Sequence, residues 1–202
     1  MIDCPGSANP VARFPNQAMI RLFTAIEIPD EVRDTLLDLQ SGLPGATWSP
    51  YENLHLTLRF IGEVPEPMTD EIEEALWSIR APGFLLRLKG VGKFGGEGQR
   101  APARLVYAGV EHDDGLTRLQ AKIERALQGI GLEPERRKYH PHVTLARLKD
   151  TPIGRLGEYL AEHAMFSTLR FEVAEFALFS STLGREHSVY DALSSFALTP
   201  AV

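Results

Sequence analysis

The stretch His55-Leu56-Thr57-Leu58 has a close copy in the second half of the chain, His142-Val143-Thr144-Leu145. Both copies lie in apolar runs that are typical of β-strands, and alternate side chains of a strand point to the same face of a sheet. Each copy therefore places a histidine and a threonine on one face and packs its aliphatic residues on the other. Because the copies lie about half a chain apart, the pattern predicts a fold built from two related lobes.

A histidine beside a threonine on a rigid strand suits chemistry at an oxyanion. The imidazole can donate or accept a proton near neutral pH, and the hydroxyl can donate a hydrogen bond. Two such pairs that face each other would form a cleft with a general acid on one side and a general base on the other. The alternative is a pair of unrelated core histidines, each satisfied by backbone groups. The repeated context favours the paired site, since each motif is followed by an arginine, Arg59 or Arg147.

The composition is that of an ordinary globular protein. The chain has 202 residues, of which 44% are hydrophobic and 24% are charged, and this length can bury one full core. No apolar run approaches the ~20 residues of a membrane-spanning helix, and the N-terminus lacks the pattern of a signal peptide. We expect a flexible, proline-rich leader over residues 1–18, followed by a single bilobal domain over residues 19–202 that is monomeric.

The cysteine count and the charge limit the classes of function. The single cysteine, Cys4, allows no disulfide framework and no cysteine-based metal site, so a reducing cytoplasm is the expected location. The net charge of −6 argues against a nonspecific binder of long nucleic acids, but it permits a small anionic substrate. The basic segment 136–140 is either a lip that attracts phosphates or a solvated loop.

The order of predicted elements is similar in the two halves. Hydrophobic periodicity and helix-start signals predict strands and helices. The strands cover residues 21–28, 53–61, 84–91, 103–110, 142–148, 169–179 and 188–198, and the helices cover residues 31–40, 68–79, 116–127 and 153–162. We therefore predict an α+β fold with two pseudo-symmetric lobes, each an antiparallel sheet with outer helices, whose sheets face one another around a central cleft.

Two other patterns do not develop into sites. The pair His140-Pro141-His142 resembles a metal pair, but no third ligand cluster follows it, so we expect no metal. The glycine-rich stretch 92–98 lacks the Gly-Lys-Ser/Thr ending of a triphosphate-binding loop, so we expect no ATP site and interpret the stretch as a mobile loop over the substrate entrance. His187, in the last predicted hairpin, is a further candidate for the cleft wall.

Several longer stretches resemble one known family. They are residues 21–26 (RLFTAI), 53–62 (NLHLTLRFIG), 140–147 (HPHVTLAR) and the closing segment from residue 180 to Leu193. The paired His-x-Thr-x motifs are similar to those of the two-histidine phosphoesterase superfamily. The surrounding residues are similar to the bacterial and archaeal RNA 2',3'-cyclic phosphodiesterases, once called 2'-5' RNA ligases. The resemblance covers the chain from Arg21 onward.

The resemblance implies a reaction and a set of site residues. The reaction is hydrolysis of an RNA or nucleoside 2',3'-cyclic phosphate to a 2'-phosphate, with a capacity for the reverse 2'-5' ligation of RNA ends, without ATP, metal or other cofactor. The implied residues are the acid–base pair His55 and His142, with His55 as the acid, the phosphate ligands Thr57, Thr144 and Arg147, and nucleoside contacts from Phe23 and Phe60. For the two phenylalanines, a plain core position is an equally good interpretation. Two alternatives remain: a nucleotide-binding module with the same fold, and a phosphodiesterase for 2'-5'-linked oligonucleotides.

Overall fold

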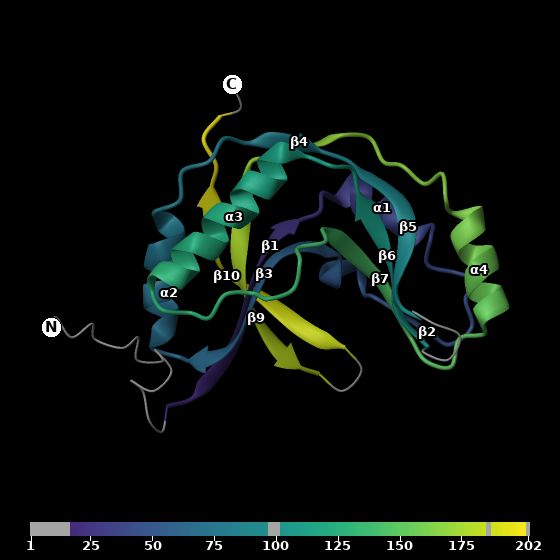
Figure 1. Cartoon of the computed structure of the whole chain (residues 1–202), viewed down its shortest axis with the longest axis horizontal. Helices are drawn as coiled ribbons and strands as arrows, with labels where there is room; N and C mark the ends of the chain where they lie inside the picture. The colour runs from purple at the N-terminus through teal and green to yellow at the C-terminus, as the bar shows by residue number, and fades with distance from the viewer. Residues whose placement is uncertain (1–16, 97–101, 185–186, 201–202) are drawn as a thin grey trace, which may run out of the picture.

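The structure, a computed structural model, describes residues 17–96, 102–184 and 187–200. Its strands are β1 (Met19–Glu27), β2 (Ala46–Trp48), β3 (His55–Pro65), β4 (Phe84–Leu86), β5 (Leu88–Gly95), β6 (Ala103–Val110), β7 (His142–Leu148), β8 (Phe171–Val173), β9 (Glu175–Leu183) and β10 (Ser188–Ala197). Its α-helices are α1 (Asp30–Leu37), α2 (Met68–Trp77), α3 (Asp114–Gly129) and α4 (Ile153–Glu162), and a short 3-10 helix, η2, covers Tyr51–Asn53. The α+β class and the outer placement of the helices are confirmed (Figure 1).

A single eight-stranded antiparallel sheet carries both histidine motifs. Its order is β10-β9-β1-β3-β7-β6-β5, and β2 pairs with β7 beside β3. We expected two sheets facing one another, but the two halves are joined edge to edge by one residue pair, Leu56 with Val143. Both side chains are fully buried. The motif strands are therefore the central strands, and neither half leaves them as an open edge.

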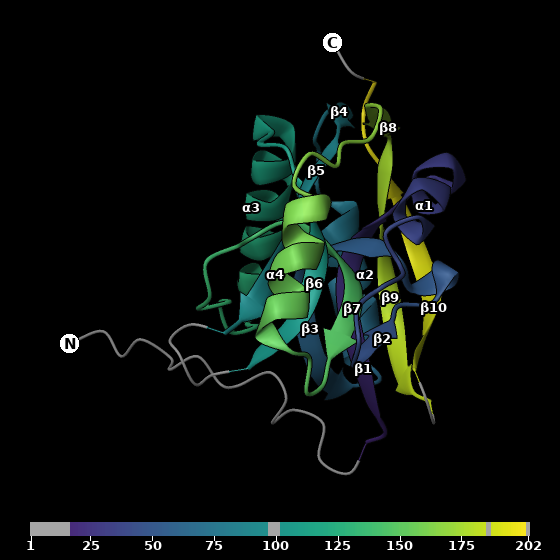
Figure 2. The same cartoon turned by 90° about the vertical axis from the view of Figure 1, so that its right-hand side faces the viewer.

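Two helices cover each half of this sheet. Helices α2 and α3 pack on one another and on β3 in the first half. Helices α1 and α4 lie over the second half, where the Tyr159 hydroxyl donates to the Leu39 carbonyl at 2.8 Å (Figures 1 and 2). Leu116, Leu119, Ile123 and Leu127 are the buried residues of α3, and their spacing is that of one helix face. This packing leaves the opposite face of the central strands open for a site.

The structure corrects three predicted elements. The strand expected over residues 169–179 is divided between β8, which pairs with β4, and β9, which pairs with β1 and β10. The strand expected over residues 84–91 is divided between β4, which pairs with β8, and β5, which pairs with β6. The loop expected over residues 92–98 is wrong as far as Gly95, because β5 continues to that residue. Residues 97–98 of that loop lie outside the described residues. Glycine lets this strand approach Tyr107 closely, since a Cβ at Gly92 would lie 2.5 Å from the end of the Tyr107 ring and would oblige that side chain to move. The short strand β2 was not predicted, and three residues carry too little pattern to reveal it.

The domain division stays a prediction, because residues 1–16 of the expected leader lie outside the described residues. Within the part of the chain that the structure describes, no helix is both long enough and apolar enough to cross a bilayer.

Candidate active site

The two histidine motifs meet across the single bridge between β3 and β7. In an antiparallel pair, the residues beside a bridged pair also lie opposite each other. Because Leu56 pairs with Val143, His55 lies opposite Thr144 and Thr57 lies opposite His142. These four side chains point away from the core face, which holds the two bridged residues. Each half of the fold thus supplies one histidine and one threonine to the same surface.

Both motifs contain a β-bulge at the same position. On β3, Thr24 pairs with Arg59 and Ala25 with Thr57, so Leu58 is an extra residue. On β7, Val106 pairs with Ala146 and Tyr107 with Thr144, so Leu145 is the extra residue. A bulge reverses the alternation of side chains beyond it. The pattern of buried, half-buried and exposed residues is accordingly the same in the two strands, from each histidine to the fifth residue after it.

The bulges decide which later residues reach the site. Strict alternation would turn Arg147 to the core face, together with Val143. The bulge instead turns Arg147 toward the cavity, and the equivalent turn on β3 brings Phe60 there. Arg59 and Ala146 turn to the core side, where both are buried. The basic residue after the second motif is therefore a site residue, and the basic residue after the first motif is not.

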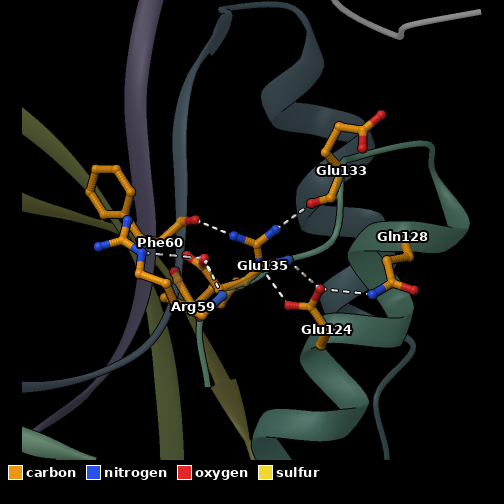
Figure 3. Close-up of polar contacts among 8 residues, drawn as sticks. Arg59, Phe60, Glu124, Gln128, Glu133 and Glu135 are labelled. Carbon is orange, nitrogen blue, oxygen red and sulfur yellow. Dashed lines mark hydrogen bonds and ion pairs between the residues drawn. The ribbon is translucent and has the colours of Figure 1, made fainter. Parts of the chain in front are cut away.

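Figure 3 shows what the Arg59 side chain does instead. Its guanidinium lies 2.6 Å from the carboxylate of Glu124 on α3. It also donates to the backbone carbonyls of Phe60 and Glu133. This buried arginine ties β3 to α3 and to the segment that leads into β7.

Each of the two histidines is oriented by an equivalent hydrogen bond between its ring and a backbone carbonyl. His55 Nδ1 lies 2.8 Å from the carbonyl oxygen of Asn53, and His142 Nδ1 lies 2.7 Å from the carbonyl oxygen of His140. A carbonyl only accepts, so Nδ1 carries the proton and donates it. In the neutral ring, Nε2 is then the nitrogen that can accept a proton from a substrate or return one to it.

Burial keeps both rings neutral at neutral pH. It lowers the pKa of His55 to about 4, although the hydrogen bond to Asn53 works in the opposite direction. Burial also lowers the pKa of His142, against the hydrogen bond to His140. The positive charge of a protonated His142 contributes to the low pKa of His55, so the two rings are near enough to influence one another.

Aromatic rings enclose each histidine. The His55 ring lies 5.0 Å from Phe23 and 5.1 Å from Tyr190, between ring centres. The His142 ring lies 4.9 Å from Phe94 and 5.3 Å from Tyr107. These rings restrict water around each imidazole, which accounts for the lowered pKa values.

A cavity of about 570 Å³ lies beside the motifs. It is lined by six of the seven predicted site residues, His55, Thr57, Thr144, Arg147, Phe23 and Phe60, and by His187. His142 is not part of this wall, although the register places it opposite Thr57. The charged side chains among the described lining residues are two arginines, Arg21 and Arg147, and no carboxylate joins them. In a chain of net charge −6, this wall is suited to an anion.

Sequence reasoning missed several residues of the wall, among them Arg21, Trp48, Asn53 and Tyr190. A signal existed for Arg21, which lies two residues before Phe23 in a strand and therefore on the same face. Asn53 holds the wall together, because its amide donates to the Ser188 carbonyl of β10 at 2.8 Å. Tyr190 could not be found in this way, since nothing local places β10 near the first motif.

The basic segment 136–140 lies outside the cavity wall. Arg137 is exposed and lies 3.6 Å from the carboxylate of Glu135. Tyr139 donates from its hydroxyl to the Thr57 carbonyl at 3.3 Å, and His140 Nε2 lies 3.1 Å from the Tyr107 hydroxyl. The segment therefore supports the strands behind the site. Across the described residues, no three histidine, cysteine, aspartate or glutamate side chains form a group able to hold a metal ion.

The fold and this site define a two-lobed protein with paired histidine–threonine motifs, and comparison with known proteins places it in a family. The family model described as the 2'-5' RNA ligase superfamily matches residues 28–185. The chain belongs to this family.

Several curated relatives carry the same description. The chain is 38% identical to the RNA 2',3'-cyclic phosphodiesterase of Aeropyrum pernix, over 80% of this chain and 90% of the relative. It is 34% identical to the protein of that name from Thermotoga maritima, over 86% and 93% of the two chains. The Escherichia coli protein of that name is 30% identical, over 89% of this chain and 97% of the relative.

Solved structures agree with the fold. Escherichia coli LigT in its apo form superposes with a TM-score of 0.74 at 28% identity, covering 91% of this chain and 99% of that one. The protein TT0787 of Thermus thermophilus gives a TM-score of 0.75 at 28% identity, covering 89% and 98%. Escherichia coli LigT complexed with 3'-AMP gives a TM-score of 0.73 at 28% identity, covering 90% of this chain and 99% of that one.

Proposed function

We propose that this protein hydrolyses RNA or nucleoside 2',3'-cyclic phosphates to 2'-phosphomonoesters with two histidines and no metal ion. The observation that carries the proposal is the meeting of two histidine–threonine pairs across the Leu56–Val143 bridge, with Nδ1 of each ring bound to a carbonyl. The description shared by the relatives supports the same substrate class.

The reaction needs two proton transfers on opposite sides of one phosphorus atom. One neutral imidazole accepts a proton from water as the water oxygen attacks phosphorus. The bond from phosphorus to the ribose 3' oxygen breaks, and the other imidazole, protonated, donates its proton to that oxygen. The products are a 2'-phosphomonoester and a free 3' hydroxyl. Strain in the five-membered ring lowers the barrier, so a metal ion is not required.

The remaining site residues bind the phosphate oxygens. Thr57 and Thr144 each lie opposite a histidine and can donate a hydroxyl proton to a non-bridging oxygen. Arg147 supplies a guanidinium that can donate two parallel hydrogen bonds. Negative charge grows on these oxygens during attack, so such donors stabilise the transition state more than the ground state. Phe60, which is 40% exposed, offers ring surface for the nucleoside. Phe23 is 3% exposed and packs against His55, Phe179 and Tyr190, so it can meet the nucleoside only with the small part of its ring that lines the cavity.

Two observations assign the acid and the base in opposite ways. The family resemblance implies that His55 is the acid and His142 the base. Burial lowers the pKa of His55 to about 4, which favours His55 as the neutral base of the free protein. A substrate that needs no acid decides between the two assignments.

The same machinery accounts for reverse ligation. A 5' hydroxyl of a second RNA end, in place of water, would attack the cyclic phosphate and form a 2'-5' linkage with no ATP. We propose that the protein acts as a monomer. We also propose that it acts in the cytoplasm, in agreement with the single cysteine of the chain.

The test uses purified full-length protein and the four nucleoside 2',3'-cyclic phosphates in excess EDTA. We expect turnover to the 2'-phosphate, with one ¹⁸O from labelled water in the phosphate. A 3'-phosphate product would overturn the assignment of the broken bond. Loss of turnover in EDTA with recovery on added zinc or manganese would overturn the metal-free mechanism. Tight binding without turnover would favour a nucleotide-binding module, and cleavage of 2'-5'-linked oligonucleotides alone would favour the other alternative.

A further inference from the structure

Arg21 is the second cation of the cavity wall, and its place in the fold is specific. Its guanidinium lies over the ring of Phe60, with 4.8 Å to the ring centre. Both side chains line the cavity. Among the described residues, no carboxylate forms an ion pair with Arg21. A cation–π contact of this kind uses the positive charge of the guanidinium and leaves N–H groups available to an anion.

The repeat explains why this cation comes from a different strand. Phe60 occupies the position on β3 that Arg147 occupies on β7, after equivalent bulges. The first half thus has an aromatic ring where the second half has its phosphate-binding arginine. Arg21 of β1 restores a positive charge on that side by stacking on the ring.

The strand geometry separates Arg21 from the reacting phosphate. On β1, Arg21, Phe23 and Ala25 alternate on the face that lines the site, and Ala25 pairs with Thr57. Four residues of strand place the Arg21 Cα about 13 Å from the Cα of Ala25. The Arg21 guanidinium lies over Phe60, three residues beyond Thr57 on β3, so an anion at Arg21 and a phosphate at Thr57 occupy different places along the cavity.

We propose that Arg21, seated on Phe60, binds the internucleotide phosphodiester on the 5' side of the terminal nucleotide. This inference rests on the proposed function and goes further, because it makes the RNA end the preferred substrate over a free nucleoside cyclic phosphate. The free nucleoside lacks that phosphodiester. A cavity of about 570 Å³, with arginines from two different strands and no acidic side chain among its described residues, accommodates two phosphates.

The experiment compares kcat/KM for uridine 2',3'-cyclic phosphate and for the dinucleotide UpU 2',3'-cyclic phosphate. We expect wild type to prefer the dinucleotide and Arg21→Gln to lose about tenfold on it, the size of a screened charge-assisted hydrogen bond. The loss on the mononucleoside should be under about twofold. Arg155→Gln is the matched control, since it removes the same charge from an exposed ion pair on α4.

A neutral substrate isolates the contact. A methylphosphonate in place of the internucleotide phosphodiester should cost wild type about the same tenfold and cost Arg21→Gln nothing further. Equal losses on both cyclic phosphates would overturn the inference, because Arg21 would then act at the reacting phosphate. Unchanged kinetics in Arg21→Gln, or a loss equal to that of Arg155→Gln, would overturn it as well.

A binding measurement keeps this inference separate from the proposed function. Uridine 2'-phosphate and UpU 2'-phosphate can be titrated by calorimetry whether or not the protein turns over a cyclic phosphate. Arg21→Gln should weaken the dinucleotide about tenfold and leave the mononucleotide unchanged. Equal affinities of wild type and Arg21→Gln for the dinucleotide would refute the Arg21 contact, and absence of turnover by wild type would refute only the proposed reaction.

Discussion

Strands β3 and β7 follow the same backbone course past their histidines, but their side chains have diverged. Each has a carbonyl-bound histidine, a threonine two residues on and a bulge at the next residue. Beyond the bulge, β7 sends Ala146 to the core and Arg147 to the cavity, whereas β3 sends Arg59 to the core and Phe60 to the cavity. The backbone is thus alike in the two halves up to the bulge, and the residues after the bulge give the cavity an arginine from one half and an aromatic ring from the other.

The largest expected effect comes from breaking the shared part. His55→Ala and His142→Ala should each lower kcat by about 10²- to 10⁴-fold, the usual size of a general acid or base contribution. The double variant should be little worse than either single variant, because both groups act in one displacement. Thr57→Val and Thr144→Val are the internal controls and should lose less, since neither moves a proton. A loss below about tenfold in either histidine variant would contradict the assignment.

The next largest effect is on stability, and it comes from Arg59, the residue that the β3 bulge turns to the core. Arg59→Met leaves Glu124 largely buried without its partner, so the free energy of unfolding in urea should fall by about 3 kcal/mol. Arg59→Met combined with Glu124→Met should recover most of this loss. The exposed pair of Arg155 and Glu158 is the control, and Arg155→Gln should cost under about 1 kcal/mol. If Arg59→Met cost no more than this control, the buried anchor would be unimportant.

The two residues that the bulges turn to the cavity, Arg147 and Phe60, should affect different kinetic parameters. Arg147→Met should lower kcat by about tenfold or more, because its charge stabilises the oxyanion that grows in the transition state. Phe60→Leu should mainly raise KM, by about fivefold, since stacking on a base is the same in ground and transition states. Steady-state kinetics on one cyclic phosphate measures both. The opposite division of kcat and KM effects would mean that Phe60 stabilises the transition state and Arg147 only binds the substrate.

The smallest effect is in the pH profile. The rate rises with pH as the base loses its proton and falls as the acid loses its own. Burial lowers the pKa of His55 to about 4 and also lowers that of His142, so both limbs lie below the ordinary value of about 6.5. The profile of kcat/KM, which reports the free protein, should be a bell with its maximum below pH 6.5. A maximum above pH 7, with the protein folded throughout, would contradict a lowering of the two histidine pKa values by burial.

Regular periodicity made the elements of this fold predictable, and long-range pairing limited the rest. The bounds of β6, β7 and α4 are those expected, because alternation and an amphipathic face mark them locally. The bulges at Leu58 and Leu145 have no local mark, since leucine is an ordinary strand residue. Arg147 was therefore assigned by family resemblance and could not have been placed by alternation, which turns it the other way.

The same limit explains the missed and misplaced parts of the site. Arg21 could have been added once Phe23 was chosen, because the two share a strand face. Tyr190 reaches His55 only through the pairing of β10 with β9 and of β9 with β1, which no local pattern contains. The glycines of residues 92–95 indicated a loop, yet Gly92 serves close packing against Tyr107 within a strand.

The most direct test of a divided acid–base pair uses a substrate whose leaving group needs no acid. In a nucleoside 2',3'-cyclic phosphorothiolate with sulfur as the bridging 3' atom, the leaving thiolate has a pKa near ~8.5 and departs unprotonated. We predict that one of His55→Ala and His142→Ala regains most of its activity on this substrate while the other stays inactive. Rescue of His55→Ala makes His55 the acid, and rescue of His142→Ala makes His142 the acid. Rescue of both variants, or of neither, would contradict a site in which the two histidines divide the two proton transfers.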